Sequence, residues 1–299
     1  MKKLLSILLL CATLLPAFAQ SDDFGLWTSL GAQKDISKRW SVNLGTEARF
    51  EDNVSKVTRM GLNFGITYKP IKYLRIGAGY AYMRDRYAGQ AAVNYSTDEN
   101  GIDYINGYNS DPSYRRDKNR AYVQVTGRYK FQRFTFSLRE RVQYTHFQPV
   151  TYQRTKYRSC ELTEDEADIY ALTDEPFVTM QDGNTTRYFS TEPTYFMDDY
   201  YATSLVDHLK HSKHRFYLRS RLQVSYNVKG IPLEPYASFE VSNNLRDGFS
   251  LKKRRYIVGL DYTLAKRHTF GLSYVYSNGV DDDSEGNLHA ISVGYTIHL

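Results

Sequence analysis

The sequence predicts an all-β chain, a single antiparallel transmembrane β-barrel of about 10 to 12 strands with two long extracellular loops. Three observations support this prediction. Polar and apolar residues alternate with a period of two, Tyr and Phe are abundant (27 and 15 of 299 residues), and the mean hydropathy is −0.55. Strands of a membrane barrel expose every second residue to lipid, so their alternation is strong while their averaged hydropathy stays low.

The N-terminal residues 1–19 have the three parts of a secretory signal peptide. Two lysines come first, an apolar run follows from Leu4 to Leu15, and small residues lead to a cleavage site after Ala19. The apolar run is too short to cross about 30 Å of hydrocarbon. We therefore expect cleavage, with residues 20–299 forming the mature outer-membrane barrel.

Ten segments after the signal peptide fit the pattern of a membrane strand. In the first of them, Trp40, Val42 and Leu44 share one phase, while Ser41 and Asn43 share the other. The full set of predicted strands is Trp40–Phe50, Arg59–Tyr68, Leu74–Tyr82, Ala121–Phe131, Phe134–Tyr144, Phe216–Tyr226, Leu233–Val241, Tyr256–Leu264, Phe270–Tyr276 and Ile291–Leu299.

The connections between these strands alternate in length. If the C-terminus is periplasmic, the short turns fall on the periplasmic side, and the long segments near 85–118 and 147–214 fall outside the cell. The segment Gly25–Gln33 adds an eleventh strand, whereas bacterial single-chain barrels use even numbers. Two alternatives remain: a further strand is missed, or Gly25–Gln33 does not span the wall.

One residue conflicts with the alternation. Glu140 falls on the apolar phase of its strand, where a carboxylate facing lipid is costly. We expect a β-bulge that resets the register there, in preference to a position near the membrane edge.

The second phase of the strands is polar and rich in arginine. Lipid-facing Arg near the midplane costs about 2 to 4 kcal/mol, so these side chains are expected to line the lumen. This phase carries nine arginines but four acids, one of which is Glu51. The surplus of positive charge favours a hydrated lumen that is blocked or narrow and prefers anions. The predicted lumen-lining residues are Arg49, Arg59, Arg75, Arg128, Arg139, Arg141, Arg219, Arg221, Arg255, Glu47, Glu240 and Asp261.

Several short stretches resemble a family of bacterial outer-membrane proteins catalogued as domain of unknown function 2490. They cover most of the mature chain except the two long loops. The resemblance implies a barrel in the outer membrane and brings no activity or catalytic residues. The stretches are Asp23–Leu30, Lys38–Trp40, Glu47–Phe50, Pro235–Glu240, Arg254–Tyr256 and Gly259–Tyr262.

The sets of catalytic residues known from outer-membrane barrel enzymes are incomplete in this sequence. Barrel lipases need a His and a Ser two residues apart on one strand face, but Gln148 stands where His146 would need Ser. His289 and Ser292 are three apart, which places them on opposite faces. Protease-type residues occur in the second long loop, and an acidic run that resembles a solvated turn more than a Ca²⁺ site lies near the C-terminus. These candidates are Asp198, Asp199, Asp207, His208 and Asp281–Asn287.

These observations predict a non-enzymatic, porin-like outer-membrane protein of a Gram-negative bacterium, with a structural, binding or narrow anion-preferring transport role. The alternative is a surface-exposed hydrolase with its site in the extracellular loops. No catalytic, cofactor or metal site is predicted. The expected partners are outer-membrane lipid, the barrel insertion machinery, and an anionic solute or carbohydrate. The net charge of +6 is scattered, which argues against nucleic acid.

Tyrosines are concentrated in the two long loops. Tyr-rich segments suit contact with carbohydrate or protein partners, because the ring and hydroxyl bind at low entropic cost. The alternative is that these rings pack on one another and cap the barrel. The sequence leaves both open.

Overall fold

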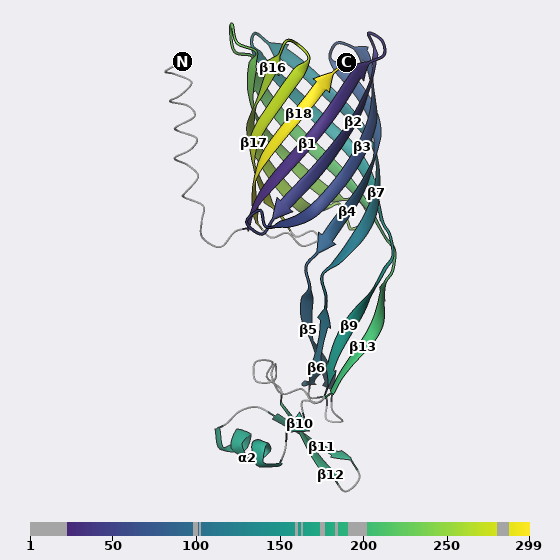
Figure 1. Ribbon diagram of the computed structural model, residues 1–299, viewed down its shortest axis with the longest axis vertical. Coiled ribbons are helices and arrows are strands. Elements are labelled where there is room, and N and C mark those ends of the chain that lie inside the picture. The colour runs from purple at the N-terminus through teal and green to yellow at the C-terminus, as the bar shows by residue number, and fades with distance from the viewer. Residues whose placement is uncertain are drawn as a thin grey trace. The chain divides into compact units, whose positions relative to one another are not determined.

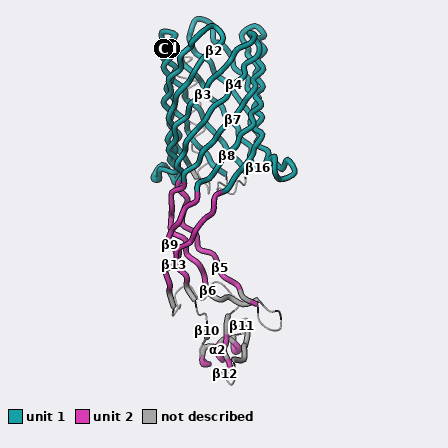
Figure 2. The backbone as a smooth tube through the Cα atoms, turned by 90° about the vertical axis from the view of Figure 1, so that its right-hand side faces the viewer, with its two compact units in different colours: residues 1–85, 117–148, 213–299 teal, residues 86–116, 149–212 magenta. Residues whose placement is uncertain are grey.

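The computed structural model describes residues 23–97, 101, 103–158, 161–162, 164–173, 177–182, 185–190, 202–279 and 287–299. They form two compact units, coloured separately in Figure 2. The first unit holds the described residues up to Asp85 together with Asp117–Gln148 and Lys213–Leu299, and the second holds Arg86–Arg116 and Pro149–Ser212. The predicted signal peptide lies outside the described residues.

Eleven of the described strands close into a barrel with the order β1-β18-β17-β16-β15-β14-β8-β7-β4-β3-β2 (Figure 1). The predicted all-β barrel is confirmed, and each of the eleven predicted segments falls on one of these strands, with Leu299 alone just beyond the end of its strand. The strands are β1 (Asp23–Asp35), β2 (Trp40–Glu51), β3 (Lys56–Ile71), β4 (Leu74–Tyr87), β7 (Tyr114–Phe131), β8 (Phe134–Phe147), β14 (Lys213–Tyr226), β15 (Leu233–Asn244), β16 (Ser250–Leu264), β17 (His268–Asn278) and β18 (Leu288–His298).

The barrel closes through a parallel pair. β1 pairs with β18 from Asp23↔Leu288 to Gln33↔His298, and it pairs antiparallel with β2 on its other side. An odd number of strands cannot alternate in direction all the way round, so one neighbouring pair must be parallel. The segment Gly25–Gln33 therefore does form part of the wall. Both alternatives that the sequence suggested for the odd count are wrong for the described barrel.

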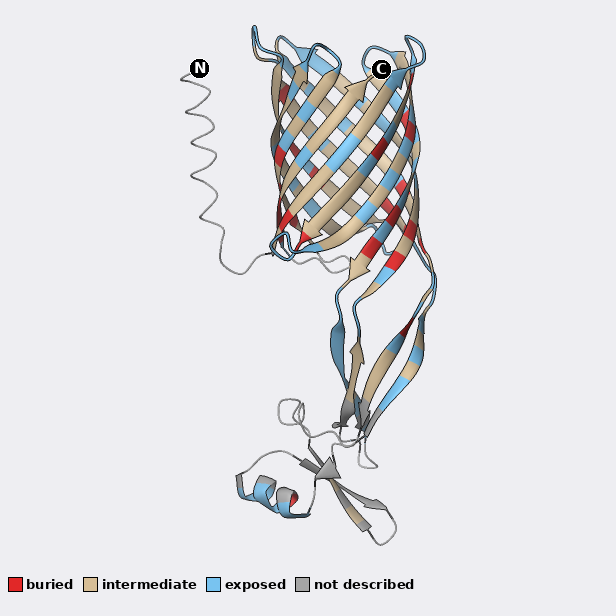
Figure 3. Cartoon of the chain, viewed as in Figure 1, coloured by how far each residue is buried: buried red, intermediate tan, exposed pale blue. Residues whose placement is uncertain are grey.

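The outer face of the barrel is apolar. Residues of the predicted apolar phase are exposed on strand after strand, as Leu44 (58%), Leu62 (55%), Val123 (58%) and Val258 (62%) illustrate. Their neighbours in sequence are less exposed, so the strands change colour repeatedly along their length in Figure 3. This is the alternation from which the strands were predicted.

The register at Glu140 is regular. Glu140 pairs with Ser220 of β14 and Val125 of β7 with no shift on either side. The predicted β-bulge at this position is therefore wrong. Glu140 stays on the outer phase, half-buried, and accepts a hydrogen bond of 2.6 Å from the Ser220 hydroxyl, which partly compensates its carboxylate.

Small residues allow large inner side chains to lie against the wall. A Cβ added at Gly79 would lie 2.4 Å from Cζ of Tyr122 and 2.7 Å from the carbonyl oxygen of Phe64. The Tyr122 ring therefore occupies the space that any side chain at Gly79 would need. Inner aromatic rings and glycines of neighbouring strands are packed as complementary pairs.

The second unit contains strands that the sequence analysis assigned to long loops. Four form a sheet with the order β13-β9-β6-β5, and three short ones form a sheet with the order β10-β12-β11. The rings of Tyr87, Tyr114 and Tyr152 stack on one another at centroid distances of 5.0 and 4.8 Å. The elements are β5 (Gln90–Thr97), β6 (Asp103–Asp111), β9 (Val150–Arg158), β10 (Glu161–Leu162), α2 (Glu164–Thr173), β11 (Phe177–Asp182), β12 (Thr185–Ser190) and β13 (Ala202–Lys210).

Among the described residues, no helix has both the length and the apolar character needed to cross a membrane.

Candidate functional site: a basic pocket inside the barrel

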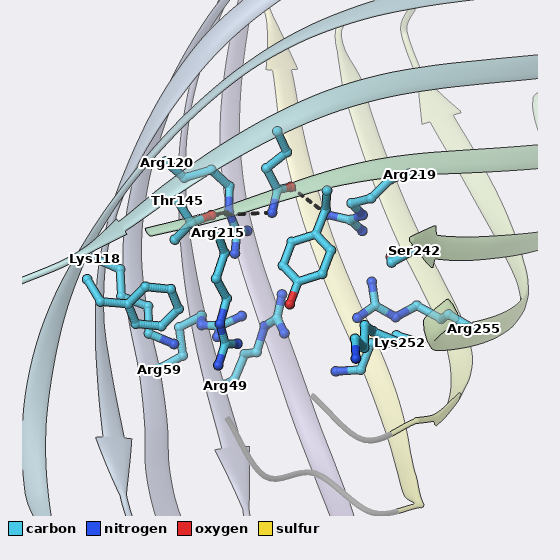
Figure 4. Close-up of a pocket in the computed structure, with 14 residues that line it drawn as sticks. Arg49, Arg59, Lys118, Arg120, Thr145, Arg215, Arg219, Ser242, Lys252 and Arg255 are labelled. Carbon is cyan, nitrogen blue, oxygen red and sulfur yellow. Dashed lines mark hydrogen bonds between the residues drawn. The ribbon is translucent and has the colours of Figure 1, made fainter. Parts of the chain in front are cut away.

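A cavity of about 100 Å³ lies inside the barrel, and we call it the inner basic pocket (Figure 4). Nine of its lining residues are cationic, and none of the described residues that line it is acidic. The lining consists of Arg49, Arg59, Lys118, Arg120, Gln143, Thr145, Phe147, Arg215, Tyr217, Arg219, Ser242, Lys252, Lys253 and Arg255.

Strand alternation and one bulge place these side chains. Lys118 and Arg120 share the inner phase of β7, and Arg215, Tyr217 and Arg219 share that of β14. Consecutive residues of a regular strand point to opposite faces, yet both Lys252 and Lys253 line the pocket. The register between β15 and β16 shifts at this point, from Ser242↔Lys253 to Asn243↔Leu251, which leaves Lys252 as the extra residue.

Glu240 on β15 binds three arginines. Its carboxylate lies 2.6 Å from Nη2 of Arg139 and 3.3 Å from Nη1 of Arg255, and it also accepts a hydrogen bond from Arg219. The Glu240 side chain is almost fully buried, at 4% exposed. A carboxylate in this position balances the charges of several guanidinium groups at once.

Asp85 on β4 is a second anionic centre. It accepts hydrogen bonds from Nε and Nη2 of Arg59, the first at 2.8 Å, and lies 2.7 Å from Nζ of Lys118. The Lys118 ammonium and the Arg215 guanidinium also lie over the Phe147 ring, at 4.5 and 4.9 Å from its centroid. The ring's negative face attracts both cations.

Trp27 on β1 holds two further cations. The guanidinium carbon of Arg49 lies 4.1 Å from the centroid of the Trp27 ring, and that of Arg255 lies 5.3 Å from it. Arg49 also pairs with Glu47 of the same strand at 3.4 Å. Because Arg255 belongs to β16 and Arg49 to β2, one indole connects cations from both sides of the β1–β18 junction.

The remaining inner arginines bind mainly neutral groups. Arg120 donates to the Thr145 hydroxyl at 3.3 Å, and Arg141 donates from its Nε to the Gln124 side-chain oxygen at 2.9 Å. The Arg141 guanidinium also lies 4.0 Å from the centroid of the Tyr122 ring. These contacts satisfy hydrogen bonds without neutralising charge.

The structure brings together most of the predicted lumen-lining residues and separates the others. Arg49, Arg59, Arg219 and Arg255 line the inner basic pocket itself. Glu47 and Glu240 pair with arginines of this pocket, and Arg139 shares the Glu240 carboxylate with them. The rest lie elsewhere. Arg128 lines a second cavity of about 610 Å³, Arg221 donates to Gln223 at 2.7 Å, Arg75 is exposed near the β3–β4 turn, and Asp261 pairs across the sheet with Glu234 and Gly271.

Sequence reasoning missed five of the pocket's cations, and also Asp85, which pairs with two of the lining cations. Asp85, Lys118, Lys252 and Lys253 were assigned to loops, and Arg120 and Arg215 directly precede predicted strands. The signal for four of them was present, because Lys118, Arg120, Arg215 and Lys253 continue the inner phase by steps of two. Only Lys252 depends on the bulge, which the alternation does not encode.

The candidate catalytic residues are not assembled among the described residues. Asp207 and His208 are consecutive on β13, so their side chains point to opposite faces. His146 stacks on His214 at 4.7 Å on the outer phase, and His289 lies within hydrogen-bond distance of the Tyr274 hydroxyl. Asp198, Asp199 and 281–286 lie outside the described residues. Within the part that is described, no group of three His, Cys, Asp or Glu is placed to hold a metal ion.

Comparison with known proteins identifies a family. The family model described as a protein of unknown function (DUF2490) matches residues 24–287, and the chain belongs to this family. No curated protein matches the chain. Two solved structures are similar over 86% of this chain and 79% of theirs. They are the β domain of the Bordetella autotransporter BrkA (12% identity, TM-score 0.42) and the translocator domain of the autotransporter NalP from Neisseria meningitidis (11%, 0.46).

Proposed function

We propose that this DUF2490 protein is a non-enzymatic barrel of the bacterial outer membrane that binds small anions inside its wall and passes them through a narrow, hydrated lumen. The observation that carries this proposal is the inner basic pocket, with nine cationic side chains inside a barrel whose outer face is apolar.

The outer face supports the membrane location. Soluble proteins rarely expose contiguous apolar patches larger than a few hundred Å². Here large apolar side chains are exposed on strands all round the barrel. Aromatic pairs occur towards both ends of the strands, such as Trp40 with Tyr68 and Tyr144 with Phe216. Such rings suit the two lipid–water boundaries, and a closed barrel leaves no unpaired strand edge in lipid.

The dimensions favour a narrow passage. Barrels of eight strands are filled by their side chains, whereas those of 16 to 18 leave an aqueous channel. This barrel lies between these limits. The ion pairs of Glu240 and Asp85 join strands that are neighbours or next neighbours in the barrel, so they line the wall more than they cross the interior. Ion pairs that follow the wall leave space for water in the interior of the barrel.

The charge of the lumen favours anions. Basic residues also line the second cavity, where Lys72, Arg128 and Lys130 stand against the single acid Glu234 among the described lining. Rings of Arg and Lys in a low-dielectric pore attract anions and repel cations. These two cavities therefore present the same sign of charge.

The location is tested by fractionation and by gel mobility. The mature chain is expected in the outer-membrane fraction, and in detergent the unboiled protein is expected to migrate faster than the boiled protein. Recovery in the soluble periplasmic fraction would contradict the proposal.

The passage is tested by conductance in a planar lipid bilayer under a salt gradient. We expect a small current whose reversal potential indicates anion preference. Substitution of Arg120 and Arg219 by Gln, which removes two cations from the pocket, should reduce that preference. A cation-selective current, or the absence of any current from folded protein, would overturn the transport role.

A further inference from the structure

We propose that the inner basic pocket is a binding site for a doubly charged tetrahedral oxyanion of the phosphate or sulfate type. This inference rests on the proposed function, because it names the ligand class of the same site. Its experiment measures binding, whereas the passage is measured as current, so the two can fail separately.

Arg120 lies among the like charges that line the pocket. Arg120 is repelled by Arg59, Arg219 and Arg49, attracted by Glu47, and hydrogen-bonded to the neutral hydroxyl of Thr145. Repulsion between like charges is stronger inside a protein wall than in bulk water, because the effective dielectric constant is lower. A bound dianion would stabilise all of these guanidinium groups at the same time, because each lines the same cavity.

The arrangement of the cations favours a tetrahedral anion over a planar one. They come from β2, β3, β7, β14 and β16, and Figure 4 shows Arg49, Arg59, Arg120 and Arg215 reaching into one region from different strands. A carboxylate carries two oxygens in one plane, whereas a phosphate or sulfate carries four oxygens in a tetrahedral arrangement. Four oxygens directed to different sides can accept hydrogen bonds from several forks at once.

Neutral groups hold the cations in place alongside Glu47, Asp85 and Glu240. Trp27 and Phe147 each hold two cations over their faces, and Gln143 accepts a hydrogen bond of 3.2 Å from Nη1 of Arg219. The Nε of Arg219 is buried and has no hydrogen-bond partner among the described residues. The pocket is thus ordered before a ligand arrives, which lowers the entropic cost of binding.

The size of the cavity fits one such anion. A water molecule needs roughly 10 to 15 Å³ by the same measure of volume. A cavity of about 100 Å³ therefore has room for several waters, or for one phosphate group that displaces them.

The test compares an arginine that lines the pocket with an arginine on the outer face of the barrel. Arg120→Gln removes a cation from the pocket, and Arg254→Gln removes the same charge from the exposed outer face, next to Arg255. Binding of inorganic phosphate, glycerol phosphate, sulfate and acetate to the folded protein in detergent is measured by calorimetry at constant ionic strength. Unboiled gel mobility verifies that each variant is folded.

We expect saturable binding of phosphate or sulfate with one site per chain, at least about tenfold weaker in Arg120→Gln and unchanged in Arg254→Gln. Saturation by glycerol phosphate as well would show that an ester enters the pocket, and binding of the free anions alone would show that it does not; both support the proposal. Equal effects of acetate and phosphate, or equal losses in the two variants, would overturn it. Anion current without such binding would remove this inference and leave the passage intact, and binding without current would do the reverse.

Discussion

The inner and outer faces of the barrel are built from the same strands, but a carboxylate has different hydrogen-bond and ion-pair partners on each face. On the inside, Glu240 contacts three guanidinium groups. On the outside, Glu140 accepts a hydrogen bond from a neutral group, the hydroxyl of Ser220. In this wall, a charged side chain is stabilised by the partners that strand pairing places around it. Neutralising Glu240 should therefore destabilise the barrel, whereas neutralising Glu140 should not.

The largest effect is expected from Glu240→Gln. The variant leaves Arg139, Arg219 and Arg255 close together without their shared anion, and breaking a buried ion pair costs about 3 to 5 kcal/mol. The free energy of unfolding, measured by urea titration in lipid vesicles, should fall by that amount. A loss below about 1 kcal/mol would mean that water, and not Glu240, balances these arginines.

A somewhat smaller loss is expected when a charge is added to the outer face. Val258 is 62% exposed near the middle of β16, and an arginine facing lipid near the midplane costs about 2 to 4 kcal/mol. Val258→Arg should therefore lower the free energy of unfolding in vesicles, while the control Val258→Leu should not. If the arginine variant were as stable as the control, the outer face would not contact lipid.

Neutralising the outer carboxylate, Glu140, is expected to change the free energy of unfolding in the opposite direction. Glu140→Gln removes a charge that faces lipid and keeps an oxygen that can accept the hydrogen bond from Ser220. We expect the stability in vesicles to be unchanged or to rise by up to about 1 kcal/mol. Ser220→Ala, which removes the donor and leaves the charge, should lower it. A loss in Glu140→Gln comparable to that in Glu240→Gln would end the distinction between the two faces.

The alternation was sufficient to predict the barrel strands because burial in this fold has a period of two, and each strand is long enough to repeat it. It could not predict the parallel pair of β1 and β18, since direction leaves no trace in alternation. It also failed where side chains depend on neighbours from other strands. Glu140 was assigned a bulge because its partner Ser220 is 80 residues away, and the second unit was assigned to loops because its strands pair with one another at distant positions.

The sequence predicted the positive charge of the inner site, but not the full set of residues that line it. The excess of arginine on one phase indicated a basic lumen, and the structure places Arg49, Arg59, Arg219 and Arg255 around one cavity. The bulge that adds Lys252 depends on the pairing of β15 with β16. That pairing is a property of the closed sheet and not of either strand alone.

The smallest effect is expected at an ion pair in the second unit, which tests whether the inner face of the barrel is unusual. Asp111 accepts hydrogen bonds from Nη2 of Arg154 at 2.9 Å and from the Tyr152 hydroxyl at 2.7 Å. The hydrogen bond from Arg154 is the main cause that lowers the pKa of the Asp111 carboxyl below its usual value. A lowered pKa in the folded state means that this contribution to stability is present above the unfolded value, near pH 4, and is lost as the pH falls through the folded one.

Asp111→Asn should therefore weaken the second unit at pH 7 by about 1 kcal/mol or less, as for other partly exposed ion pairs. The difference between variant and parent should disappear at low pH, where the parent carboxyl is protonated as well. Hydrogen exchange of β9 measures it without interference from the barrel, whose exchange should not change. A loss at pH 7 as large as that of Glu240→Gln would mean that partner number, and not burial inside the barrel wall, determines what a carboxylate contributes in this protein.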